Sequence, residues 1–443
     1  MEDLDPLKLD RALFRTATEW RRWRRGLDSA DLTSLPAFEL NRWAIGLSCF
    51  QRVLELHPAD PLRGPLGRWV YRLTEQRVNQ RALLIREHRL RREIVQIPSE
   101  RSEMPLSQLK QALLLPAGGR AERLAKRPGR LGALARHGGN YRTASLLVWE
   151  RRQEFAQRMG LSSPDSIELP CEAPELLASR WLTESQDAWL STSTPDLNHA
   201  IELGVDARDD HGWPARLSPA SLQRLLSEGD LFRSLDLDPG ELPQALGGSS
   251  FLRAMARVGA AWHDAASPKD QPFVIAHDPY GLRRREVGAR FAMLALNPAF
   301  ATHKLRLSGP RLEHHLRATQ RTLLLESRIA ALRVLLRKPA LTGATAFNQA
   351  FEEYSALVFG EPLDARLSAT LFSLHVDDVQ RFCGLFLAAA SSAALREAHD
   401  FDWFRNPRGI DQVRADAAIP PRHTLDAEQG AAGLDALKQL LAS

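Results

Sequence analysis

Residues 251–265 and the segment that follows them are spaced like the two helices of a catalytic zinc site. The first segment reads F-L-R-A-M-A-R-V-G-A-A-W-H-D-A and places apolar residues at the spacing of one buried helix face. A second helix is predicted from Arg283 to just before Pro298, and it contains Glu286. Zinc that activates water is commonly bound by two histidines one turn apart and by a further carboxylate, beside a glutamate that acts as base. The chemistry that this spacing suggests is metal-assisted hydrolysis.

The residues that this reaction needs are replaced. Positions 256–260 read A-R-V-G-A where H-E-x-G-H would stand, so Ala256 and Ala260 occupy the histidine positions and Arg257 occupies that of the base. Glu286 is the retained ligand position. One carboxylate cannot hold zinc, and arginine stays protonated and cannot act as a base. We therefore expect no metal, no cofactor and no hydrolysis, and we interpret Glu286 as a carboxylate paired with Arg257 in place of the metal.

Three stretches between about residues 178 and 409 resemble bacterial oligoendopeptidase-like and thimet-like zinc metallopeptidases, which are gluzincins. Met255–Ala265 is similar to the H-E-x-G-H-A-x-H-F-A helix of that family without its metal ligands. The stretch L-R-R-R-E-V-G-A-R-F-A-M-L around Glu286 is similar to the family's T-E-G-F-A-x-L-F helix. Residues 393–409 are similar to its closing L-R-x-x-F-G-x-x-W-F-R-x-P-x-A-G pattern. The resemblance implies a large, two-lobed, helical zincin-like body that is mainly α with few short strands.

The resemblance also implies which functional groups have been lost. In active members, a tyrosine shortly before the closing pattern stabilises the tetrahedral intermediate, whereas Phe382 lies in the corresponding stretch here and has no hydroxyl to donate. His263 matches the family motif and is either a relic of an active site or a structural histidine that hydrogen-bonds a neighbour. The leading hypothesis is a catalytically inactive pseudopeptidase that binds a peptide or protein partner.

A basic segment supports an alternative of another class. Residues 116–139 are rich in glycine and arginine, and we interpret them as a boundary or an exposed basic element. Through residues 116–142 a non-enzymatic helical protein could bind nucleic acid or an acidic surface, although no nucleic-acid-binding motif accompanies the segment. The residues of this surface would be Arg120, Arg123, Lys126, Arg127 and Arg130. A third hypothesis, an enzyme with rebuilt chemistry in the same cleft, is supported by no residue set in the sequence.

Composition limits the cellular setting. The chain has 443 residues, of which 44% are hydrophobic and 26% charged, and a formal net charge of +5, which is typical of a globular protein. Cys49, Cys171 and Cys383 are far apart and form no metal-binding spacing, and few cysteines fit a reducing compartment. The N-terminal residues lack the apolar core of a signal peptide, and no apolar run reaches the roughly 18 residues of a membrane span. We expect a cytoplasmic bacterial protein without a membrane partner.

Helical periodicity dominates the chain, which argues against a Rossmann sheet, a TIM barrel or a β-sandwich. No repeat of fixed period indicates a solenoid. We expect an N-terminal helical region over 1–115, a basic segment and helix over 116–165, and a metallopeptidase-like helical region over 166–443. Local patterns further predict a helix over 218–229, a loop over 236–250, a short strand over 272–275 and an extended surface segment over 405–424.

Overall fold

The chain folds into a mainly α-helical body. The computed structural model describes residues 4–25, 36–114, 120–168, 172–191, 196–198, 200–201, 248–419 and 425–442. Within these ranges the strands are β1 (Ile94–Ile97) and β2 (Ser102–Pro105), which form one antiparallel pair with Ile94 opposite Pro105. The prediction of a mainly α fold with few short strands is confirmed. The predicted helix over 218–229 and nearly all of the predicted loop over 236–250 lie outside the described residues.

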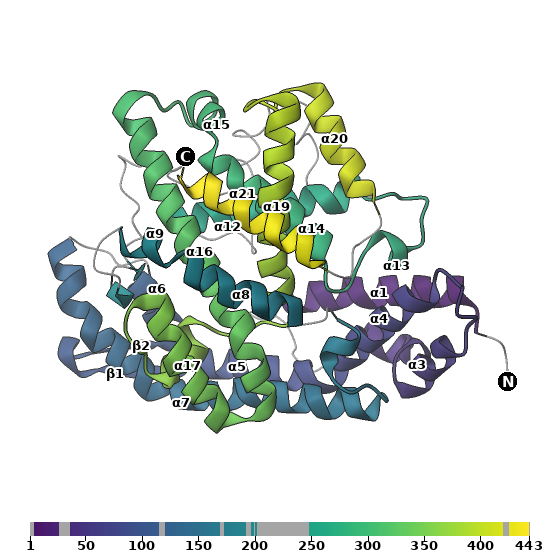
Figure 1. Ribbon diagram of the computed structural model, residues 1–443. Coiled ribbons are helices and arrows are strands. Elements are labelled where there is room, and N and C mark those ends of the chain that lie inside the picture. Colours follow the sequence, from purple (N-terminus) through teal and green to yellow (C-terminus); the bar gives the residue numbers. More distant parts are fainter. Residues whose placement is uncertain are drawn as a thin grey trace.

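The N-terminal part, purple to blue in Figure 1, arranges short helices along a long one. Its elements are α1 (Pro6–Arg25), α2 (Pro36–Leu40), α3 (Leu47–Leu54), α4 (Arg63–Glu75), a π-helical turn over Gln76–Gln80, α5 (Arg81–Arg91), α6 (Leu106–Leu114) and α7 (Arg120–Arg158).

The C-terminal part, teal to yellow in Figure 1, stacks longer helices above α7. Its elements are α8 (Glu172–Glu184), α9 (Gln186–Leu190), α12 (Gly248–Ala266), α13 (Phe273–Ala276), α14 (Leu282–Met293), α15 (Pro298–His303), α16 (Gly309–Thr342), α17 (Ala344–Phe359), α18 (Ser368–Leu371), α19 (Asp378–His399), α20 (Pro407–Ala418) and α21 (Ala427–Ala442).

The buried apolar side chains form two clusters. The smaller one gathers α1, α3 and α4 with Phe155 at the end of α7 and Phe273 of α13. The larger one takes in the β pair, α6, the middle of α7 and most of the later helices. Asp10 of α1 joins α13 to the smaller cluster, since its carboxylate accepts the backbone N–H groups of Phe273 and Val274 at 3.2 and 2.8 Å. Because α7 contributes to both clusters, neither residue 115 nor residue 165 separates them.

The described part of the glycine-rich segment is a continuous helix rather than a boundary between elements. From Arg120 onward it belongs to α7, 39 residues long with Pro128 inside. Two of its glycines are sites of close approach: a Cβ on Gly129 would meet the side chain of Ser99, and one on Gly138 would meet the backbone carbonyl of Arg366. The glycines suggested a boundary because glycine is common in turns, but glycine also occurs where two backbones pack closely.

Two further local predictions are wrong for identifiable reasons. Residues 272–275 are not a strand, because Phe273–Ala276 form the short helix α13, whose first amides bind Asp10. Residues 405–424 are not extended throughout, because α20 begins at Pro407. There the side chain of Asn406 accepts the backbone N–H of Arg408 at 3.1 Å, and proline at the first helical position favours a helix start.

A buried ionic network connects α4, α7 and α16. Arg152 of α7 lies 3.1 Å from Glu75 of α4 and also pairs with Glu168, while Glu168 accepts a hydrogen bond from Arg337 of α16 at 2.5 Å. The side chains of Arg152, Glu75 and Glu168 are fully inaccessible to solvent. The Arg152 and Arg337 guanidinium groups both lie over the ring of Trp149. Because each of these charges depends on its partners, the network fixes three helices relative to one another.

Removing one member of this network should therefore be costly. We expect Glu168→Ala to lower the free energy of unfolding by about 3–5 kcal/mol, because it leaves two buried guanidinium groups without a shared carboxylate. Glu154→Ala is the matched control: its pair with Arg158 is exposed, so the change should be below about 1 kcal/mol. Urea unfolding followed by circular dichroism measures both, and equal effects would contradict the assigned role of Glu168.

Candidate functional site

Helices α12 and α14 pack directly against each other, as the sequence predicted for the zinc-motif segments. A Cβ added to Gly288 would lie 2.7 Å from the carbonyl oxygen of Ala256, and one on Gly259 would lie 2.8 Å from the side chain of Phe291. Ala260 is buried on the same side of α12. Small residues therefore let the two backbones approach closely, and this contact occupies the face of α12 on which two metal ligands would be needed.

Glu286 lies on the side of α14 that faces away from α12. It is two residues from both Arg284 and Gly288, which lie against α12, and residues two apart point to nearly opposite sides of a helix. Its carboxylate accepts hydrogen bonds from Arg283 at 2.6 Å and from Arg290 at 3.2 Å. Both arginines also bind Asp416 of α20, Arg283 at the backbone carbonyl and Arg290 at the carboxylate.

This geometry corrects the expectation that Glu286 pairs with Arg257 where a metal would lie. Among the described residues, the guanidinium groups that bind Glu286 come from its own helix. Arg257 instead lies close enough to Arg285 to lower the pKa of that arginine, after the larger effect of burial. The Glu286 carboxylate thus supports the packing of α14 on α20 rather than a site shared with Ala256 and Ala260.

Three consecutive arginines of α14 reach three different neighbours. Arg283 binds α20, Arg284 pairs with Asp264 of α12 at 3.0 Å, and Arg285 pairs with Asp377 at the start of α19. Arg381 of α19 binds the same Asp377 carboxylate at 3.0 Å. Consecutive residues turn by 100° around a helix, so one run of arginines can address every flank.

Five of these side chains form what we call the arginine–aspartate cluster. All are partly accessible, with between 21% and 36% of the side chain exposed, in contrast to Glu286 at 5%. The members are Asp264, Arg284, Arg285, Asp377 and Arg381. Three guanidinium groups share two carboxylates, so the cluster carries excess positive charge while remaining open to solvent.

The protein environment perturbs the ionisation of these groups. Burial lowers the pKa of Arg285 to about 10, against the attraction of Asp377. Burial also opposes ionisation of Asp377, but Arg285 and Arg381 outweigh it and hold the pKa of that carboxyl well below its usual range. The pKa of Asp264 is lowered in the same way, with Arg284 overcoming the effect of burial. The cluster is therefore fully charged near neutral pH, and it is a place where anionic groups are favoured.

The adjacent Asp378 behaves differently. Burial raises its pKa from 3.8 to about 6, although Arg333 and Arg381 oppose the change. One carboxylate oxygen accepts the backbone N–H of His375 at 2.6 Å. Two neighbouring aspartates thus have pKa values shifted in opposite directions, which is a pattern found at functional sites and also in structural ion networks.

Of the other predicted site residues, His263 and Arg257 lie near this cluster. His263 is buried with its Nδ1 3.5 Å from a carboxylate oxygen of Asp264. Phe382 is buried against Phe386, at 4.7 Å between ring centroids, and is part of the core. The sequence analysis singled out none of Asp264, Asp377 and Arg381, because a lone aspartate or arginine carries no motif.

The predicted basic surface is largely committed to internal contacts. Arg130 binds both carboxylate oxygens of Glu100, at 2.6 and 3.0 Å, and Lys126 pairs with Glu122 at 2.6 Å. Arg127 is 2% exposed and donates to the backbone carbonyl of Asn198. Arg123 is half-buried, and Arg120 begins α7. These side chains therefore offer less free positive charge than their number suggests.

The described residues contain neither a cluster of metal-binding side chains nor a membrane-spanning helix. No three histidine, cysteine, aspartate or glutamate side chains come together there in a way that could hold a metal ion. None of the helices in the described ranges combines the length and apolar character needed to cross a membrane.

The close contact between α12 and α14 can be tested with one methyl group. We expect Gly288→Ala to destabilise the protein by about 1–3 kcal/mol, because the added Cβ meets backbone that cannot rotate away. Gly139→Ala in α7 is the control, since nothing lies within 4 Å of its Cβ position, and there alanine should be neutral or stabilising by up to about 1 kcal/mol. Thermal unfolding of both variants decides whether the contact is as tight as described.

The raised pKa of Asp378 predicts a pH dependence with a definite sign. Between pH 3.8 and about 6 the folded protein holds a proton on this carboxyl that the unfolded chain has released, so this group's contribution to stability falls as the pH rises. Asp378→Asn has no carboxyl to titrate and should not lose this stability as the pH rises. The melting temperature of the variant minus that of the wild type should therefore increase from pH 4.5 to pH 7. The exposed Asp411→Asn should show no such trend; a flat difference for Asp378→Asn would contradict the raised pKa.

Comparisons with known proteins leave the family unassigned. The sequence matches no family model and no curated protein. Among solved structures it is similar to a chain described as "PZ PEPTIDASE A with inhibitor 2", with a TM-score of 0.47 and 11% sequence identity. That match covers 90% of this chain and 84% of the other. A TM-score below 0.5 is too low to establish a shared fold, so the likeness assigns this chain to no family.

Proposed function

We propose that this protein is a peptidase-like binding protein without hydrolytic activity, a pseudopeptidase that takes a peptide or protein partner at the arginine–aspartate cluster. The observation that carries the proposal is the arrangement of α12 and α14. Ala256 and Ala260 supply no ligand, Arg257 supplies no base, and Glu286 is turned away and bound by two arginines. These positions therefore do not supply the two histidines and the carboxylate that a catalytic zinc ion needs as ligands.

The cluster supports binding through its charge. Arg381 is the most exposed of the three guanidinium groups and shares Asp377 with Arg285. A carboxylate from a partner could replace part of the contact with Asp377 and would offset the repulsion between neighbouring arginines. Guanidinium groups are well suited to this because they bind carboxylates through two parallel hydrogen bonds. The partner expected here therefore carries acidic side chains.

The alternative, binding of nucleic acid or an acidic surface through residues 116–142, has less support. Arg127 is buried, and Arg130 donates to both carboxylate oxygens of Glu100 and, through its remaining guanidinium nitrogen, to the backbone carbonyl of Ala112. Phosphate binding by these residues would first have to break those contacts, which lowers the affinity available.

Metal content tests the first half of the proposal. We expect protein purified without chelator to contain zinc well below one ion per chain by plasma mass spectrometry, and to leave quenched-fluorescent peptides intact. Zinc near one per chain with hydrolysis that chelation abolishes would overturn the proposal and would require ligands from other residues.

Binding tests the second half. A fluorescein-labelled peptide of alternating glycine and glutamate should bind in an anisotropy titration, and Arg381→Ala should weaken it by about tenfold, the loss expected for one charge-assisted contact. Arg317→Ala is the control, because Arg317 is exposed and pairs with Glu313 of its own helix. Equal affinities for the two variants would exclude the cluster as the binding site.

A further inference from the structure

The first helix, α1, exposes a face on which apolar and basic side chains are interspersed. Leu7 and Phe14 are 50% and 49% exposed. Because they are seven residues apart, they lie on the same side of the helix, two turns from each other. The exposed basic residues of α1 are Lys8, Arg11, Arg15 and Arg22.

The opposite face of α1 is committed to the protein interior. Leu9, Leu13 and Ala17 belong to the smaller apolar cluster. In a helix that lies on a membrane, such a broad apolar face inserts among the lipids, whereas here it packs against protein and leaves the narrow row of Leu7 and Phe14 for a ligand. A narrow apolar row beside positive charge suits a polypeptide better than a lipid surface.

The positive charge on this face is not neutralised by the chain itself. In the ranges that the structure describes, Lys8, Arg11 and Arg15 form no ion pair. The Lys8 ammonium lies over the ring of Trp43, 5.5 Å from the centroid. Asp10, an acidic residue of the same helix, is buried and accepts the first amides of α13. Carboxylates of a partner are therefore favoured at this face.

This face lies beside the arginine–aspartate cluster. The ring of Phe14 contacts that of Phe273 in α13, with 5.3 Å between centroids, and Phe273 contacts the ring of His277 just after α13. Burial lowers the pKa of His277, Asp264 of the cluster raises it, and Arg21 of α1 lowers it further. His277 therefore lies between α1 and the cluster, close to charges of both.

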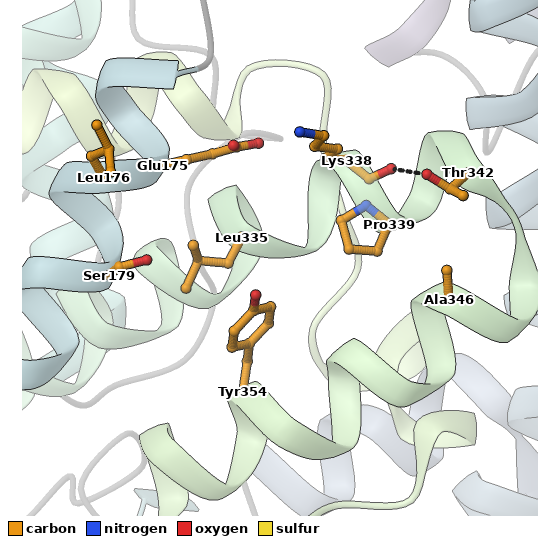
Figure 2. Close-up of a pocket in the computed structure, with 9 residues that line it drawn as sticks. All are labelled: Glu175, Leu176, Ser179, Leu335, Lys338, Pro339, Thr342, Ala346 and Tyr354. Carbon is orange, nitrogen blue, oxygen red and sulfur yellow. Dashed lines mark hydrogen bonds between the residues drawn. The ribbon is translucent and has the colours of Figure 1, made fainter.

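The pocket drawn in Figure 2 differs from this face in its charge balance. It lies between α8, α16 and α17 and has a volume of about 620 Å³. Figure 2 shows the Lys338 ammonium facing the Glu175 carboxylate of the same lining, and Leu176 turned away from the pocket. The basic group of the pocket thus already faces an acidic one, whereas the basic groups of α1 await a partner.

We propose that the exposed face of α1 binds an acidic polypeptide segment of a partner protein that carries apolar side chains among its carboxylates. An apolar side chain of the segment packs between Leu7 and Phe14, and its carboxylates bind Arg11 and Arg15. This site goes beyond the proposed function, because it is built from another helix and adds an apolar contact to charge. Its position beside the cluster lets one partner reach both.

Two fluorescein-labelled peptides of equal charge test the proposal, one repeating Glu-Leu-Glu-Gly and the other Glu-Ser-Glu-Gly. We expect the leucine peptide to bind the wild type saturably in an anisotropy titration. Its affinity should be about tenfold higher than that of the serine peptide, the gain expected from removing one apolar side chain from water. Leu7→Ser and Phe14→Ala should each reduce this preference for leucine. Arg11→Ala combined with Arg15→Ala should weaken both peptides by about tenfold.

Matched controls separate this site from general surface effects. Leu176→Ser removes an apolar side chain that is 74% exposed on α8, and Arg317→Ala removes an exposed arginine of α16. Both should leave the two affinities unchanged. The variants of α1 change exposed side chains, so their melting temperatures should stay near that of the wild type, which distinguishes lost binding from unfolding.

Three results would overturn the proposal. The first is equal affinity of the two peptides for the wild type, or a preference for leucine that persists in both Leu7→Ser and Phe14→Ala. The second is binding to phosphatidylserine vesicles without saturable peptide binding, which would assign the face to a lipid surface. The third is weakening by Arg381→Ala with no effect of the α1 variants, which would leave the proposed function standing.

Discussion

Buried charge fixes how the two apolar clusters of this protein are arranged. Glu75 belongs to α4, which contributes to the smaller cluster, and Arg337 belongs to α16, which contributes to the larger one. Arg152 and Glu168 connect them in a region from which water is excluded. Apolar contacts alone tolerate sliding and rotation, whereas a fully buried ion network is stable in few geometries, because each unpaired charge is costly.

A second constraint lies in α14, which packs against α12 and α19 and is bridged to α20 by Arg283 and Arg290. Glycines allow its backbone to approach α12 and α19, since a Cβ on Gly288 or on Gly384 would meet the opposite helix. Arginines then fix its rotation through contacts on each side. The helix combines close approach with directional ion pairs, and this combination brings the arginine–aspartate cluster together near its N-terminal end.

The small residues at 256, 259 and 260 have a packing explanation that requires no history of catalysis. At this helix crossing, larger side chains on Gly259 or Ala260 would separate α12 from α14. The same holds for Phe382, which fills the core beside Phe386. Whatever reaction the spacing suggests, the present side chains serve the contact between helices, and the groups that remain accessible to a ligand are charged residues on neighbouring turns.

The sequence by itself determined the helical class of the fold, because apolar periodicity is a local property of the chain. The pairing of the segments at 251–265 and 283–297 was expected only because they resemble the two motif helices of zinc metallopeptidases. The sequence could not determine which way Glu286 points, since this depends on the rotation of α14 between three neighbours. Nor could it show that Gly129 and Gly138 serve close packing, because proximity to Ser99 and Arg366 exists only in the folded chain. The cluster of Asp264, Arg285 and Asp377 joins residues more than a hundred positions apart, and only tertiary contacts could decide that these charges meet.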